Sequence, residues 1–318
     1  MTNNPKKIDC SVVASVYNEE ECVQLFYEAL SKVLAPQQIS YEIIFVNDGS
    51  VDNSFTILKE IAANDHTVRI VDFSRNFGHE AAMLAGIDHA CGEAVICMDS
   101  DLQHPPEMIP KMLQKKAEGF EVVNMVRTIR KDAGFVQKMN SKLFYKFINS
   151  ISSVKLAENA SDFFLISKKV CNLLQNNFRE RTRFLRGIIQ LVGFKKTTIE
   201  FEAPKRAAGK SKYSFFKLLK LSLTAISSFS KIPLQLGIIT GLIFSVISIL
   251  LIVFSFVMWC LDKTIPGYTT LIIFMSAFAG IQLFVMGLIG QYISYVFDEV
   301  KERPVYIVNE VYGFESEE

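Results

Sequence analysis

Two long stretches near the C-terminal end of this 318-residue chain contain no Asp, Glu, Lys, Arg or His. They run over residues 234–259 and 269–297, and each is longer than the roughly 20 residues that an α-helix needs to cross a hydrocarbon core. Only a short turn, residues 261–268, separates them. A pair of buried core helices is the alternative, but the lengths favour a transmembrane hairpin over residues 232–298.

Basic residues flank this predicted hairpin on both sides. Before it come Lys205, Arg206, Lys210, Lys212, Lys217, Lys220 and Lys231, and after it come Lys301 and Arg303. The turn between the stretches carries one Lys, which one Asp offsets. Because cytoplasmic segments are enriched in Lys and Arg, we expect a multi-pass protein of the cytoplasmic (inner) membrane with both termini in the cytoplasm. The first apolar run, residues 10–16, is too short to be a secretory signal.

Residues 213–231 lead into the first stretch and mix apolar positions with Lys217 and Lys220. This pattern favours an amphipathic helix that lies in the membrane interface. Residues 299–318 are predicted to form a cytoplasmic C-terminal tail. With 34 Lys and Arg against 33 Asp and Glu the charge is nearly balanced, and we expect no nucleic-acid partner.

Residues 1–212 have the pattern of an α/β domain. Strands are predicted at 8–16, 41–47, 68–73, 94–98 and 121–126, and helices at 19–34, from about 52, at 79–90 and at 107–118. Strands that alternate with helices imply parallel pairing through right-handed crossovers. No G-x-G-x-x-G follows the first strand, so a dinucleotide site is not expected.

Polar loops follow the first four predicted strands. They are residues 17–20, 47–52, 74–78 and 99–103. Parallel sheets bind ligands beyond the carboxyl ends of their strands, so these loops predict one shared cleft. Tyr17 could stack on a base, Asp48 could accept a hydrogen bond from one, and Arg75 could pair with a phosphate. Each loop also has a simpler interpretation as a turn or a helix start.

Asp99 and Asp101 stand one residue apart after the buried strand 94–98. Both carboxylates could turn toward one hard cation, and Gln103 could add a third oxygen. Mg²⁺ or Mn²⁺ is commonly held by a few carboxylates, with the remaining positions left to substrate phosphates. Taken alone, the motif is equally compatible with a solvated acidic turn that caps a helix.

Together these motifs resemble family 2 glycosyltransferases with the GT-A fold. The matching segments are Tyr17–Glu19, Asn47–Asp52, Arg75–Gly78, Asp99–Gln103, Arg183–Gly187 and Gly209–Tyr213. The similarity is closest to polyprenyl-phosphate glycosyltransferases, such as bactoprenol glucosyltransferases and dolichol-phosphate mannose synthases, and it spans residues 8–308. It implies an inverting transfer of one sugar from a nucleotide sugar, by default UDP-glucose, to a polyprenyl phosphate such as undecaprenyl phosphate. The resemblance also implies a homo-oligomer, for which a tetramer is one possible form.

The resemblance also implies roles for individual residues. The nucleotide would be bound by Tyr17, Glu19, Asp48, Arg75 and Asp99. The metal would be held by Asp99, Asp101 and Gln103. The catalytic residues would be Asp101 and Asp162, and the acceptor phosphate would be bound by Arg127, Arg183, Arg206 and Lys212. Asp162 could act as a base or only orient a substrate, since a phosphate acceptor is already largely ionised at neutral pH.

The chain departs from the common family pattern at several positions. Asn47 and His104 stand where Asp is frequent, and His104 is expected at the surface rather than as an extra ligand. Gln291 and Tyr295 replace frequent Glu and Arg in the second apolar stretch.

Two other functions compete with the transferase interpretation. A processive polysaccharide synthase typically has a Q-x-x-R-W motif, but the single Trp of this chain, Trp259, lies in the first apolar stretch. A non-catalytic, membrane-anchored protein that binds a sugar nucleotide is the second alternative, and the intact pair Asp99 and Asp101 argues against it.

Overall fold

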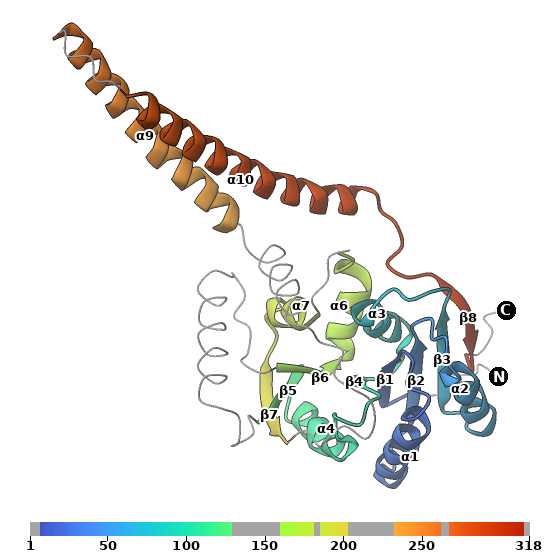
Figure 1. The fold of residues 1–318 in the computed structure, drawn as a ribbon. Coiled ribbons are helices and arrows are strands. Elements are labelled where there is room, and N and C mark those ends of the chain that lie inside the picture. The colour runs from blue at the N-terminus through green and yellow to red at the C-terminus, as the bar shows by residue number, and fades with distance from the viewer. Residues whose placement is uncertain (1–6, 129–159, 181–184, 203–231, 262–266, 315–318) are drawn as a thin grey trace. The chain divides into compact units, whose positions relative to one another are not determined.

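The computed structural model describes residues 7–128, 160–180, 185–202, 232–261 and 267–314 (Figure 1). The chain divides into two compact units. One is an α/β unit that ends with the residues after Pro304, and the other is a pair of long helices inserted between its parts. The predicted interfacial helix, residues 213–231, lies outside the described residues.

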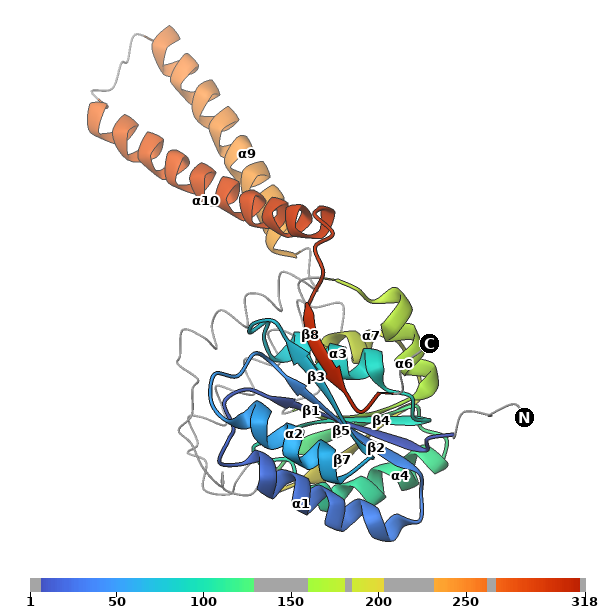
Figure 2. The same ribbon diagram turned by 90° about the vertical axis from the view of Figure 1, so that its right-hand side faces the viewer.

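An eight-stranded mixed sheet forms the centre of the α/β unit, with the order β7-β5-β6-β4-β1-β2-β3-β8 (Figure 1). Figure 2 shows the same unit turned by 90°, with β8 beside β3. The strands are β1 (Cys10–Val16), β2 (Tyr41–Asn47), β3 (Val68–Phe73), β4 (Ala94–Asp99), β5 (Val122–Arg127), β6 (Ala160–Ser167), β7 (Lys196–Phe201) and β8 (Val308–Tyr312). Strands β1 to β4 pair in parallel, as predicted.

Two strands that the sequence analysis did not predict make the sheet mixed rather than all-parallel. Strand β6 lies antiparallel between β4 and β5, and β8 lies antiparallel to β3. The alternating pattern covered only residues 8–126, so it contained no information on strands contributed by later parts of the chain.

Helices cover both faces of this sheet (Figure 1). They are α1 (Val23–Leu34), α2 (Ser54–Asn64), α3 (His79–His89), α4 (Ile109–Ala117), α6 (Lys168–Asn177) and α7 (Leu185–Leu191). Phe26 of α1, Leu58 of α2 and Met112 of α4 share one buried cluster with Phe45 of β2. In these helices apolar residues recur three and four positions apart. This spacing gives each helix one continuous apolar stripe, which packs against the sheet.

Helix α3 packs on the opposite face and approaches the sheet closely. A Cβ atom added at Gly86 would lie 2.0 Å from Cγ1 of Val13 in β1. Only a glycine allows this approach, and every residue from Ala81 to Ile87 is buried. The tight contact fixes the helix start, His79, beside the carboxyl ends of the central strands.

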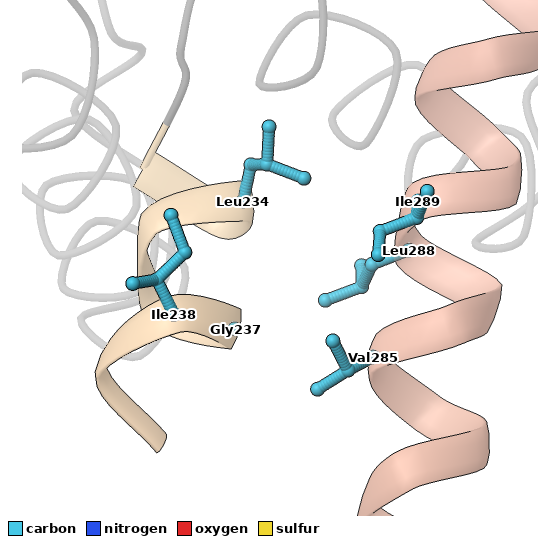
Figure 3. A pocket seen from close by; sticks show the side chains of 6 residues that line it. All are labelled: Leu234, Gly237, Ile238, Val285, Leu288 and Ile289. Carbon is cyan, nitrogen blue, oxygen red and sulfur yellow. The ribbon is translucent and has the colours of Figure 1, made fainter. Parts of the chain in front are cut away.

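The second unit consists of α9 (Ile232–Cys260) and α10 (Tyr268–Val300). Both helices coincide with the predicted apolar stretches and are long and apolar enough to cross a membrane, with hydropathies of 2.8 for residues 237–258 and 1.4 for residues 277–300. Between them lies a pocket lined by Leu234, Gly237, Ile238, Val285, Leu288 and Ile289 (Figure 3). This lining has no polar side chain, so we assign it no part in the chemistry.

The chain re-enters the α/β unit after α10. Residues 299–318 were predicted as a tail, but within them Val308–Tyr312 form the edge strand β8 beside β3. A five-residue strand with one charged residue gives only a weak periodic signal, and its partner was not identifiable from the sequence.

Candidate active site

The polar loops after β1, β2, β3 and β4 lie at one edge of the sheet, because these four strands are parallel. Two further residues reach the same edge from later strands. Arg127 ends β5, which runs in the same direction as β4. Asp162 is near the start of β6, and an antiparallel strand begins where its neighbours end.

Hydrogen bonds join the first loop to the second. The backbone N–H of Asn18 donates to Ser50 Oγ at 3.0 Å, and that of Glu19 donates to Ser54 Oγ at 2.9 Å. Asn18 has a φ of 53°, which turns the chain sharply after β1. Tyr17 is 40% exposed, so its ring is available to a ligand.

Asp48 joins the second loop to the third. Its carboxylate is buried and accepts from the backbone N–H of Phe77 at 2.7 Å, from that of Gly78 at 3.0 Å and from Asn76 Nδ2 at 3.0 Å. Burial raises the pKa of Asp48, and the N–H groups of Phe77 and Gly78 offset part of this. This carboxylate organises the loop that carries Arg75, whose guanidinium lies 3.9 Å from the Phe77 ring centroid.

Gly49 allows these two loops to touch. Its φ is +64°, and an added Cβ would lie 2.4 Å from the carbonyl carbon of Arg75. The contact leaves no room for a Cβ atom, and the left-handed conformation also favours glycine here. The loop geometry that holds Arg75 therefore depends on a glycine after Asp48.

The acidic motif ends β4 in a tight turn. Asp99 is 30% exposed at its side chain, Leu102 has a φ of 60°, and the N–H of Gln103 donates to Asp101 Oδ1 at 3.0 Å. Gln103 Oε1 accepts from Arg127 Nη2 at 3.0 Å. A carbonyl oxygen has two lone pairs, so this bond leaves one for a metal.

Two carboxylates and one amide oxygen fit a Mg²⁺ or Mn²⁺ ion that takes its remaining ligands from phosphate and water. In the described part of the chain, no three His, Cys, Asp or Glu side chains gather into a cluster that could hold a metal ion.

The prediction of a surface position for His104 is wrong. The residue is 1% exposed, its ring stacks on Phe163 at a centroid distance of 5.2 Å, and its Nδ1 accepts from the N–H of Asp99 at 2.9 Å. Burial lowers the pKa of His104, which favours the neutral ring that this hydrogen bond requires. The stacking partner comes from β6, which the sequence analysis had not placed beside β4.

Asp162 lies in a cluster of charged side chains. Both of its oxygens accept hydrogen bonds from Arg186, and Nε2 of His79 lies 3.5 Å from Asp162 Oδ2 and 3.5 Å from Asp99 Oδ1. Burial by itself would raise the pKa of Asp162, but the charge and hydrogen bonds of Arg186 and His79 outweigh it and hold that pKa well below its usual range. A carboxylate paired in this way is a weak base.

Sequence reasoning missed His79 and Glu80, the first residues of α3. His79 Nδ1 lies 2.9 Å from Ser15 Oγ. Burial would lower the pKa of His79, but Asp162 and Asp99 raise it to about 9. Burial, with the charge of Asp162, raises the pKa of Glu80 to about 7. Their position directly after the third strand-end loop was the available signal.

The described residues therefore bring together most of the predicted site. Tyr17, Glu19, Asp48, Arg75, Asp99, Asp101, Gln103, Arg127 and Asp162 all lie on or beside loops at this edge. Arg183, Arg206 and Lys212 lie outside the described residues. Gln291 and Tyr295 lie on α10, where Gln291 is exposed and Tyr295 is half-buried.

A mixed α/β sheet with a D-x-D motif and polar loops at the strand ends is the architecture of GT-A glycosyltransferases. Residues 11–174 match the family model of glycosyl transferase family 2, and the chain belongs to this family. It is therefore a glycosyltransferase, as the sequence predicts.

Relatives agree with this assignment, and one solved structure shares the fold. The chain is 41% identical to the uncharacterized glycosyltransferase YkcC of Bacillus subtilis (strain 168), over 98% of this chain and 96% of the relative. It is 37% identical to the SfII prophage-derived bactoprenol glucosyl transferase of Shigella flexneri, over 94% and 96%. Mannosyl-3-phosphoglycerate synthase from Rubrobacter xylanophilus shares the fold, with a TM-score of 0.50 and 14% identity over 69% of this chain and 72% of that one.

Proposed function

We propose that the protein transfers a single sugar from a nucleotide sugar, by default UDP-glucose, to a polyprenyl phosphate at the cytoplasmic face of a membrane. The observation that carries the proposal is the convergence of Asp48, Arg75, Asp99 and Asp162 at one sheet edge in a chain similar to a bactoprenol glucosyl transferase. The product would be a polyprenyl-phosphate sugar that donates to a cell-surface glycan.

The loops after β1 to β3 would bind the nucleotide. Tyr17 has an exposed ring that could stack on a base, and Arg75 is exposed and could pair with the diphosphate. Asp48 would contact a base N–H only if it gave up one of its present hydrogen bonds to residues 76–78. We therefore propose that it contributes mainly by shaping the loop of Arg75.

Asp99, Asp101 and Gln103 would hold Mg²⁺ or Mn²⁺ on the diphosphate. The bound ion supplies Lewis-acid stabilisation of the charge that develops on the departing nucleotide. Gln103 would orient Arg127 at the same time through the bond between them. Arg127 would then face both the diphosphate and the incoming acceptor.

Asp162 would orient the sugar or the acceptor rather than remove a proton. Its ion pair with Arg186 lowers its basicity, and the acceptor phosphate is already largely ionised at neutral pH. The phosphate oxygen would attack the anomeric carbon from the face opposite the leaving nucleotide, which inverts the configuration. His79 lies between Asp99 and Asp162 and would fix the positions of the two carboxylates relative to each other.

The acceptor would reach the site from the membrane. Arg127, together with Arg183, Arg206 and Lys212, would offset the repulsion between the acceptor phosphate and the donor diphosphate. The helices α9 and α10 would form the membrane hairpin. The pairing of β8, after the hairpin, with β3, before it, supports a topology in which both hairpin ends lie on one side of the membrane.

The orientation of this hairpin would follow from its basic flanks, which favour the cytoplasmic side. Two crossing helices bury few of their own side chains, and most described apolar residues of α9 and α10 are exposed. This supports a homo-oligomer, with a tetramer as one form, in the membrane.

A donor panel tests the proposal. Purified full-length protein is incubated with undecaprenyl phosphate, Mn²⁺ and one radiolabelled donor at a time: UDP-glucose, UDP-N-acetylglucosamine, UDP-galactose or GDP-mannose. We expect label in the organic phase with one preferred donor, and UDP-glucose first. Measurable nucleotide binding without turnover of any donor would contradict the transferase activity and support a binding protein.

A further inference from the structure

We propose that Tyr306, Ile307 and Asn309, in the segment that follows the second apolar helix, hold the donor-nucleotide loops in their binding conformation. They act as positioning residues, and the inference rests on the nucleotide-sugar function proposed above. The contacts are remote in sequence: Asn309 and its partner Asp72 are 237 positions apart.

Strand pairing brings this segment to the donor edge. β8 pairs antiparallel with β3, and the pairing shifts register between Asp72 and Phe73. Beyond that shift, the N–H of Ser74 donates to the carbonyl of Ile307 at 3.1 Å. The ladder thus continues past the end of β3 into the loop that carries Arg75.

A row of rings continues the contact to Arg75. Tyr306 stacks on Phe73 with a centroid distance of 5.1 Å and an interplanar angle of 14°. Phe73 meets Phe77 edge-on at 5.6 Å, and the Arg75 guanidinium lies 3.9 Å from the Phe77 centroid. The Tyr306 hydroxyl donates to Asp88 Oδ2 at 2.7 Å, which anchors the ring to the end of α3.

A second, polar connection runs to the loop after β2. Asn309 Nδ2 donates to Asp72 Oδ2 at 2.9 Å, and Asn47 Nδ2 donates to Asp72 Oδ1 at 2.7 Å. Asp72 is 5% exposed and Asn47 is 2% exposed, so water competes little for these bonds. Asn47 directly precedes Asp48, the residue that shapes the third loop.

This connection explains one departure from the family pattern. An aspartate at position 47 would place a second carboxylate against Asp72, whereas the Asn47 amide donates to it. With Asn309 on its other side, Asp72 is satisfied by two amides from opposite ends of the chain. Asn47 and Asn309 therefore satisfy the same buried carboxylate.

The chain organisation gives the contact a functional consequence. Only five residues separate Val300, the end of α10, from Tyr306. The donor loops therefore depend on a segment that the sequence reaches only after both apolar helices. Weakening that segment should loosen the loops after β2 and β3 while leaving the D-x-D turn after β4 intact.

Four full-length variants in detergent micelles test this inference. Tyr306→Leu removes the ring stack, Asn309→Ala removes the amide, and Glu310→Gln is the matched control on the same strand. Glu310 pairs with Lys59 at a partly exposed ion pair and belongs to neither connection. Tyr306→Phe keeps the ring and removes only the hydroxyl.

Two readouts are used, hydrogen exchange of the Phe77 and Gly78 amides without ligand, and the Kd for UDP with Mn²⁺. We expect both amides to exchange faster in Tyr306→Leu and Asn309→Ala, and their Kd for UDP to rise on the order of tenfold. Glu310→Gln should match the wild type, and Tyr306→Phe should lie close to it.

Unchanged exchange and unchanged UDP affinity in both Tyr306→Leu and Asn309→Ala would overturn the inference, even if their melting temperatures fall. Failure of the wild-type protein to bind UDP would instead contradict the proposed donor. The exchange measurement needs no ligand, so it still decides whether Tyr306, Ile307 and Asn309 position the loops.

Discussion

Asp48, which is buried, and Asp162, which is half-buried, are carboxylates at one edge of the sheet, yet their surroundings are opposite. Asp48 is surrounded by N–H donors of residues 76–78, which carry no net charge, and burial leaves its pKa raised. Asp162 lies against Arg186 and His79, which hold its pKa well below the usual range. The comparison separates a region that shapes the donor loops from a charged region suited to the reacting groups.

Removing the cation beside Asp162 is the most severe test of this comparison. In Arg186→Met the carboxylate keeps its burial and its neighbour Glu80 but loses both hydrogen bonds from the guanidinium. We expect kcat to fall by about a hundredfold, since displacement of a positioned group by about 1 Å has effects of this size. The measurement is steady-state transfer to the lipid acceptor.

Arg186→Lys is the matched control for that variant. Lysine keeps the positive charge but lacks the planar fork that binds both carboxylate oxygens, so we expect partial activity. Equal kcat values for the wild type and Arg186→Met would show that the ion pair is not part of the catalytic region.

Asp48→Asn tests the other region. Asparagine keeps one acceptor oxygen, but its NH2 group would face donors where the second carboxylate oxygen now accepts from Asn76 and Gly78, which weakens the hydrogen bonding of this buried group. We expect a loss of about 1–3 kcal/mol in stability, with a higher donor KM and a smaller change in kcat. Thermal unfolding and donor kinetics measure the two effects.

Asp52→Asn is a suitable control on the same loop. Asp52 is half-buried and accepts from the N–H of Ser54 at 3.0 Å, a role that asparagine fills about as well. A donor KM that is unchanged in Asp48→Asn would mean that this carboxylate does not organise the donor loops.

The smallest expected effect is a shift in pH dependence. In the wild type the lowered pKa keeps Asp162 ionised, so its stabilising contribution is present above the ordinary pKa of about 3.9 and is lost only as pH falls through the lowered value. In Arg186→Met the pKa of Asp162 should rise, and the acid limb of kcat should move up by about one to three pH units. Superimposable pH profiles would argue that Arg186 does not control this carboxylate.

The residues predicted to bind the nucleotide lie on four consecutive strand-end loops, and their placement at one edge of the sheet could be predicted from the sequence. Local periodicity locates such strands, and parallel pairing then brings Asp48, Arg75 and Asp99 to one edge. Contacts between residues far apart in the sequence could not be predicted in this way. Neither the burial of His104 under Phe163 nor the insertion of β6 leaves a local pattern, because both depend on residues some 60 positions apart in sequence.

His79 illustrates a different limit. It was predicted only as the first residue of a helix, where a polar side chain is common. Its place between Asp99 and Asp162 depends on the close packing of α3 at Gly86 and on the antiparallel entry of β6. The edge strand β8 was missed for the same reason, since its partner β3 precedes it by more than 200 residues.

The most direct test of the account is metal-dependent transfer from radiolabelled UDP-glucose to undecaprenyl phosphate by the purified protein. We predict organic-phase label with matching UDP release, its loss with EDTA, and its recovery with Mn²⁺. Asp101→Ala should lower turnover by about a thousandfold or more, while Glu107→Gln, an exposed acid beside the motif, should not. Full transfer by Asp101→Ala, or transfer that EDTA does not reduce, would contradict a metal-dependent glycosyltransferase site at Asp99 and Asp101.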